Sequence, residues 1–156
     1  PFVTAIFLHG GFLHIPSNMW FLWVFGDNVE GHTSLFLYPI LYLASGIIGN
    51  VVQYLLMPNS AIPMLGASGA VAGVLGAYFV LFPHSQIKTL VPFFIFLTSI
   101  NVPAYLMLGY WFVLQILSGA ASFPFGSSEG GIAFFAHVGG FVTGIVIGKF
   151  FKKRKL

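Results

Sequence analysis

Apolar stretches long enough to cross a lipid bilayer, separated by short polar turns, make up almost the whole sequence. A helix needs about 20 apolar residues to cross the hydrocarbon core. The chain has 156 residues, of which 58% are hydrophobic and 6% are charged, and it has no room for a sizeable soluble domain. We therefore expect an all-α, polytopic membrane helical bundle with about five transmembrane helices, forming a single domain over residues 1–156.

The turn residues divide the chain into five expected helices. We place them at about 15–29, 34–57, 68–82, 103–117 and 132–151. The third is too short to cross a bilayer of about 30 Å, so it must begin below one membrane surface. The apolar residues 87–100, which include Pro92, are expected to be extended or to lie on the surface.

Small residues recur in the last expected helix. Gly140, Gly144 and Gly148 follow one another at intervals of four residues and therefore lie on one helix face. Such a ladder lets a second helix approach backbone to backbone. We expect close packing of another helix along this face.

Positive charge gathers at the C-terminal end, in the tail 149–156. Basic residues mark the cytoplasmic side of membrane proteins, so we expect a cytoplasmic C-terminus with Lys88 on the same side, in an integral multi-pass protein of a prokaryotic cell membrane. The lipid bilayer is the expected partner. Nucleic acid is not, because the basic residues end a helix instead of lining a groove. The absence of cysteine excludes thiol chemistry and thiolate metal sites.

Four polar side chains are expected near the outer ends of three helices: His14, Asn18, Ser68 and His137. Polar groups inside a membrane are costly and are usually kept for function. A serine hydroxyl becomes a nucleophile when a neighbouring histidine removes its proton. Ser68 and His137 suit these two roles.

The attack on a carbonyl also requires donors for the oxyanion. His14 and Asn18 are four residues apart, hence on one helix face, and can act with the Ser68 N–H. Gly66 and Gly69 would let the backbone approach a substrate closely.

Only one acidic residue, Glu129, is expected near this level of the membrane, and it lies in a glycine-rich loop. We expect a Ser-His dyad, because the third member of a triad must be buried and fixed against the histidine.

Four motifs resemble those of the rhomboid intramembrane serine proteases: GASGAVAG at 66–73, the histidine pattern from His9 through His14 to Asn18, FGDNVEG at 25–31 and AHVGGFVTG at 136–144. The resemblance covers essentially the whole chain. It implies that Ser68 is the nucleophile and His137 the general base, with His14 and Asn18 as oxyanion donors. His9 matches a family histidine just outside the first helix.

The resemblance further implies a six-helix core, of which this chain lacks the first helix and most of the loop after it. We expect transmembrane protein substrates and no cofactor. Some members have a tyrosine four residues after the serine, packed on the catalytic histidine, where this chain has Ala72. Either a neighbouring aromatic side chain then orients His137, or the ring is held less firmly. The region around Tyr110 and Trp111, with the loop 119–131, is the expected gate for substrates.

Other functions remain open on the sequence, as does the oligomeric state. The chain can be a catalytically silent relative that binds membrane clients, although its serine and histidine are both present. A channel or transporter also places polar residues along a cavity. A zinc site of His9, His14 and His137 lacks a carboxylate ligand or an HExxH pair, so we expect no metal.

Overall fold

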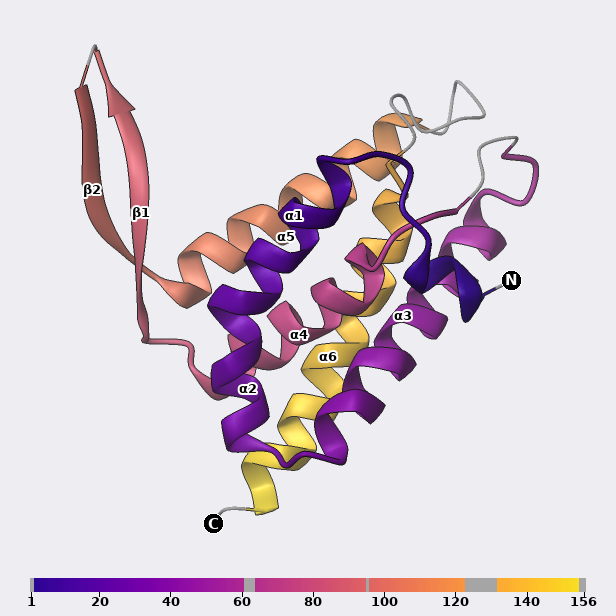
Figure 1. Ribbon diagram of the computed structural model, residues 1–156, viewed down its shortest axis with the longest axis horizontal. Helices are drawn as coiled ribbons and strands as arrows, with labels where there is room; N and C mark the ends of the chain where they lie inside the picture. The colour runs from indigo at the N-terminus through magenta and orange to yellow at the C-terminus, as the bar shows by residue number, and fades with distance from the viewer. Residues whose placement is uncertain (1, 61–63, 95, 123–131, 155–156) are drawn as a thin grey trace.

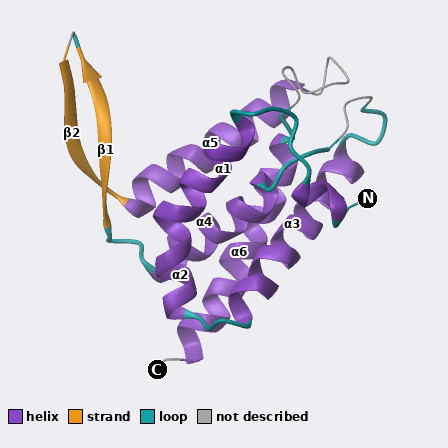
Figure 2. Cartoon of the chain, in the orientation of Figure 1, coloured by secondary structure: helices purple, strands orange, loops and turns teal. Residues whose placement is uncertain are grey.

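A computed structural model describes residues 2–60, 64–94, 96–122 and 132–154. These residues are mostly helical, and within them one β-hairpin extends away from the helices (Figures 1 and 2). In chain order the elements are η1 (Thr4–Phe7), α1 (His14–Phe21), η2 (Leu22–Gly26), α2 (Asp27–His32), α3 (Leu37–Leu56), α4 (Ser68–Leu81), β1 (Gln86–Phe93), β2 (Phe96–Pro103), α5 (Ala104–Ser122) and α6 (Phe134–Arg154).

The helices occur where the sequence predicts them, with ends that shift by a few residues. Three of the described helices are long and apolar enough to cross a membrane: Leu37–Leu56, Ala104–Ser122 and Phe134–Lys152. The helix α4 is shorter, with 14 residues, as expected for an element that begins below the membrane surface. The first expected helix contains a π-helical turn, η2, between α1 and α2.

The expectation of an all-α chain is wrong for residues 86–103. These residues form two antiparallel strands, with Gln86 paired to Pro103 and Phe93 to Phe96. The extended conformation expected for 87–100 is confirmed, but the pairing of its two halves was not foreseen. Both halves are rich in β-branched residues, which favour strands, and a two-stranded hairpin has only edge strands, where Pro92 is tolerated.

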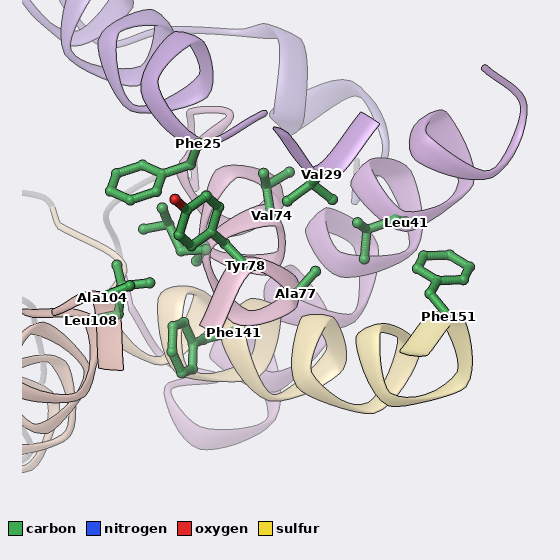
Figure 3. Packing of buried hydrophobic residues seen from close by; sticks show 12 residues of the cluster. Phe25, Val29, Leu41, Val74, Ala77, Tyr78, Ala104, Leu108, Phe141 and Phe151 are labelled. Atoms are coloured by element: carbon green, nitrogen blue, oxygen red, sulfur yellow. The ribbon is translucent and has the colours of Figure 1, made fainter. Parts of the chain in front are cut away.

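The helix α4 lies at the centre of the bundle and contacts α1, α2, α3, α5 and α6. All ten residues from Gly69 to Tyr78 are buried, which explains why this helix is apolar on every side. Figure 3 shows Val74 and Tyr78 packed among side chains from the neighbouring helices, including Phe25 and Phe141. The central helix therefore has little freedom to shift.

Glycines bring the backbones of α4 and α6 into direct contact. A Cβ atom on Gly140 would overlap the carbonyl of Gly69, and one on Gly144 would overlap the carbonyl of Gly73. On the other helix, a Cβ on Gly76 would overlap the carbonyl of Phe141. The backbone packing predicted from the glycine ladder is confirmed, and its partner is α4.

Two amide side chains on α3 hold neighbouring segments in place. Asn50 donates from Nδ2 to the carbonyl of Phe2 at 2.8 Å. The Oε1 atom of Gln53 accepts from the backbone N–H of Phe135 at 3.0 Å and of Ala136 at 3.2 Å. Helix N-termini leave their first N–H groups without partners inside the helix. Gln53 satisfies two of them and so fixes where α6 begins.

The close contact between α4 and α6 leads us to predict that adding a side chain there lowers the stability of the protein. Replacing Gly144 by alanine places a methyl group against the backbone of α4, which cannot move aside as a flexible side chain can. We expect Gly144→Ala to lower the free energy of unfolding by about 1–3 kcal/mol. Reversible unfolding in detergent micelles measures the difference.

Gly31→Ala is the matched control, because Gly31 is helical and a Cβ there meets nothing within 4 Å. We expect this variant to be unchanged or more stable by up to about 1 kcal/mol. Equal stabilities of the two variants would contradict the packing described here.

Candidate active site

A cavity of about 600 Å³ opens between α1, α4, α5 and α6. Its walls include His14 and Asn18 from α1, Ser68 from α4, and His137 from α6. The sequence analysis named seven candidate site residues, and these four of them line the same cavity. Gly66, Gly69 and His9 support its walls, as described below.

Ser68 is the first residue of α4 and follows a tight bend. Gly66 has a φ of +124°, a conformation that glycine adopts readily and other residues rarely do. Its N–H donates to the carbonyl of Ala5 at 2.9 Å, which ties the bend to the N-terminal segment. The bend ends at the helix N-terminus, where unpaired N–H groups favour developing negative charge.

The ring of His14 lies directly against this bend. A Cβ atom on Gly66 would be 2.7 Å from Cε1 of His14, 2.8 Å from its Nε2 and 3.7 Å from the Oγ atom of Ser68. His14 and Ser68 are therefore on the same side of the bend. The glycine allows the imidazole to approach the backbone beside the hydroxyl.

The face of α1 that carries His14 also carries Asn18. Asn18 is 6% exposed, and its Nδ2 donates to the carbonyl of His14 at 3.0 Å. An amide nitrogen has two hydrogens, so one remains for a group in the cavity. His9 packs edge-on against His14, with ring centroids 5.3 Å apart. The Nε2 atom of His9 is buried and has no hydrogen-bond partner in the described part of the chain.

His137 lies in the first turn of α6 and is held from α5. Its Nδ1 is 2.8 Å from Oε1 of Gln115. Its ring lies beside that of Trp111, with centroids 5.9 Å apart and planes inclined by 31°. Trp111 is thus an aromatic side chain beside His137, where some relatives of this kind have a tyrosine at the position of Ala72. Ala72 lines the same cavity.

Gln115 was missed in the sequence analysis. Its signal was modest: a polar amide in an otherwise apolar helix, four residues after Trp111 and hence on the same face. The sequence alone does not show which helix this face meets, so the contact with His137 was not predictable.

The packing of α4 on α6 brings Ser68 and His137 into the walls of one cavity. Gly69, next to Ser68, faces Ala136 on α6, because a Cβ atom added to Gly69 would be 3.4 Å from the carbonyl oxygen of Ala136. Ala136 is next to His137. The site thus combines a hydroxyl, an imidazole, hydrogen-bond donors and a helix N-terminus, which are the groups needed for acyl transfer.

Metal ligands do not gather in the described residues. No group of three or more His, Cys, Asp or Glu side chains there is arranged to hold a metal ion. The part of the expected gate loop at 123–131, including Glu129, lies outside the described residues.

Comparison with known proteins agrees with this architecture. The family model described as "Rhomboid domain" matches residues 1–154. The chain is 32% identical over 157 residues to Rhomboid protein 1, mitochondrial, of Saccharomyces cerevisiae, covering 97% of this chain and 41% of the relative. It is 42% identical over 73 residues to Rhomboid-like protein 11, chloroplastic, of Arabidopsis thaliana, covering 47% of this chain and 26% of the relative.

A third relative carries the name of an enzyme. The chain is 39% identical over 75 residues to Rhomboid protease GluP of Bacillus subtilis, covering 48% of this chain and 14% of the relative. The chain thus spans less than half the length of each of these three relatives. Because the family model covers nearly every residue, the chain belongs to the rhomboid family of membrane proteins.

Proposed function

We propose that the chain is an intramembrane serine endopeptidase that hydrolyses peptide bonds in or near transmembrane segments of other membrane proteins. The observation that carries the proposal is the cavity whose walls hold Ser68, His137, His14 and Asn18 together. Family membership and the similarity to a relative named as a protease support the same reaction class.

In the proposed reaction, the Oγ atom of Ser68 attacks the carbonyl carbon of the scissile bond while the Nε2 atom of His137 accepts the hydroxyl proton. His14, Asn18 and the N-terminus of α4 stabilise the oxyanion. His137 then gives the proton to the leaving amine, and an ester on Ser68 remains. Water, deprotonated by His137, hydrolyses this ester and restores the serine.

The proposed substrates must reach the cavity from the side and must be locally unwound, because the backbone groups of a transmembrane helix are already hydrogen-bonded. We assign the gate to α5. In its most apolar stretch 17% of the residues are buried, compared with 33% in α3 and 39% in α6. A helix with few buried residues is the one most easily displaced.

The proposed orientation puts the C-terminal ends of α4 and α6 in the cytoplasm. The Nζ atom of Lys152 donates to the carbonyl of Val80 at 3.2 Å, so the C-terminal ends of these helices lie together, and Lys88 follows shortly after α4. Basic residues on one side favour that side as cytoplasmic. The relatives come from a bacterium, a yeast and a plant, and so do not favour a prokaryotic membrane.

Labelling with a fluorophosphonate tests the dyad. We expect the wild-type protein to be labelled at Ser68, Ser68→Ala to lose the label, and His137→Ala to react at least about a hundredfold more slowly, because the general base is missing. Mass spectrometry locates the modified residue.

Ser17→Ala is the control, since this second hydroxyl lines the same cavity but donates to the carbonyl of His14 at 2.9 Å. It should leave the labelling unchanged. A wild-type protein that is not labelled, or that is labelled equally without Ser68, would refute the proposal and leave the client-binding or transport functions.

The bend before Ser68 makes a second prediction, tested by cleavage of a transmembrane substrate. Gly66→Ala puts a methyl group on a strained backbone at φ +124° and against the ring of His14. Strain of this kind costs about 1–3 kcal/mol, and we expect kcat/KM to fall about ten- to a hundredfold.

Gly69→Ala is the matched variant, because its Cβ would make an ordinary contact of 3.4 Å with Ala136. We expect it to keep kcat/KM within about threefold of the wild type. Equal activity of the two variants would show that the geometry of the bend does not serve catalysis.

A further inference from the structure

The contact between His137 and Gln115 has no part in the proposed reaction steps. The two residues are 22 positions apart, on α6 and α5, and their Nδ1 and Oε1 atoms are 2.8 Å apart. A neutral imidazole has one N–H and one lone pair, and the hydrogen bond made by one ring nitrogen determines the state of the other. This contact therefore bears directly on whether His137 can act as a base.

We propose that Gln115 is a positioning residue that keeps His137 in its base-competent form. Its Oε1 accepts the Nδ1–H of His137, which leaves Nε2 unprotonated and available to the hydroxyl of Ser68. The inference rests on the proposed function, because it assigns His137 the role of general base.

Trp111 restrains the same ring in a second way. Trp111 and Gln115 are one helical turn apart on α5, so both face His137. The indole lies beside the imidazole with ring planes inclined by 31° and so limits tilting. The hydrogen bond to Gln115 opposes a half-turn of the ring about the Cβ–Cγ bond, which would exchange Nδ1 with Cδ2. Together they fix one orientation.

Aromatic packing between α5 and α6 holds α5 where Gln115 can contact His137. Phe141, one turn after His137, is 1% exposed. Its ring centroid is 4.6 Å from that of Phe112, with planes inclined by only 21°, and 5.8 Å from that of Trp111. With the proposed gate closed, the part of α5 that carries Gln115 is thus attached to α6 through the contacts of Trp111 and Phe112 with Phe141.

A neutral amide suits this position better than a carboxylate. None of the described residues that line the cavity is Asp or Glu. In Ser-His-Asp enzymes a buried aspartate holds the histidine in the correct tautomer, but an ionised group among membrane helices is costly. An amide oxygen accepts the same hydrogen bond without a net charge.

Kinetics on full-length variants in detergent test the inference. Gln115→Leu removes the acceptor at similar size, and we expect kcat to fall about ten- to a hundredfold with KM within about twofold, as for other groups that orient a catalytic residue. Gln115→Glu keeps an acceptor oxygen and should restore kcat to within about threefold of wild type. Val113→Leu, at a position that is 51% exposed on the same helix, should change neither constant.

The outcomes separate this inference from the proposed function. If fluorophosphonate labelling of the wild-type protein does not depend on Ser68, both the proposed function and the role of Gln115 are overturned. An active wild type whose kcat is unchanged in Gln115→Leu overturns only the role of Gln115. Equal losses in Gln115→Leu and Gln115→Glu, with both variants folded, show that Gln115 does not act as an acceptor.

An NMR spectrum of the wild-type protein determines the tautomer of His137 even if a Gln115 variant fails to fold. With 15N-labelled histidine, the side-chain signals of His137 can be assigned by their loss in His137→Ala. We expect Nδ1 to carry the proton and Nε2 to be unprotonated. A neutral ring protonated at Nε2 would overturn the inference.

Discussion

Direct contact between the backbones of α4 and α6 holds the centre of the bundle together and sets where the other helices pack. Inside a bilayer the surrounding lipid is as apolar as the side chains, so helices associate through close packing instead of a hydrophobic driving force. The glycines at positions 69, 73, 140 and 144 supply that packing because a Cβ atom at the last two would overlap the facing helix. The same contact places Ser68 and His137 in the walls of one cavity.

Two amide side chains, Gln53 and Gln115, also hold the region around His137 through hydrogen bonds between helices. Gln53 binds the first N–H groups of α6 and so fixes the level at which His137 lies. Gln115, on α5, contacts Nδ1 of the same histidine through its Oε1 atom. Both are polar groups with partners inside the bundle, as polar side chains among membrane helices must have. One amide holds the helix that carries His137, and the other contacts the ring of His137 itself.

The helical architecture could be predicted from the sequence because its physical signals are local. The apolar runs and turn residues predict α3, α4, α5 and α6, and the spacing of Gly140, Gly144 and Gly148 predicts a close helix contact. The partner of that contact could not be predicted, since it depends on how distant segments meet. For the same reason Gln115 and the pairing of β1 with β2 were missed: a polar amide or an extended run does not reveal what lies opposite it.

A crystal structure of the protein after reaction with a fluorophosphonate would show whether a serine and a histidine from different membrane helices act together in this cavity. We expect a phosphorus bonded to the Oγ atom of Ser68, a phosphonyl oxygen facing His14 and Asn18, and His137 still bound to Gln115 through Nδ1. A reagent attached elsewhere, or a Ser68 separated from His137 by packed side chains, would contradict this expectation.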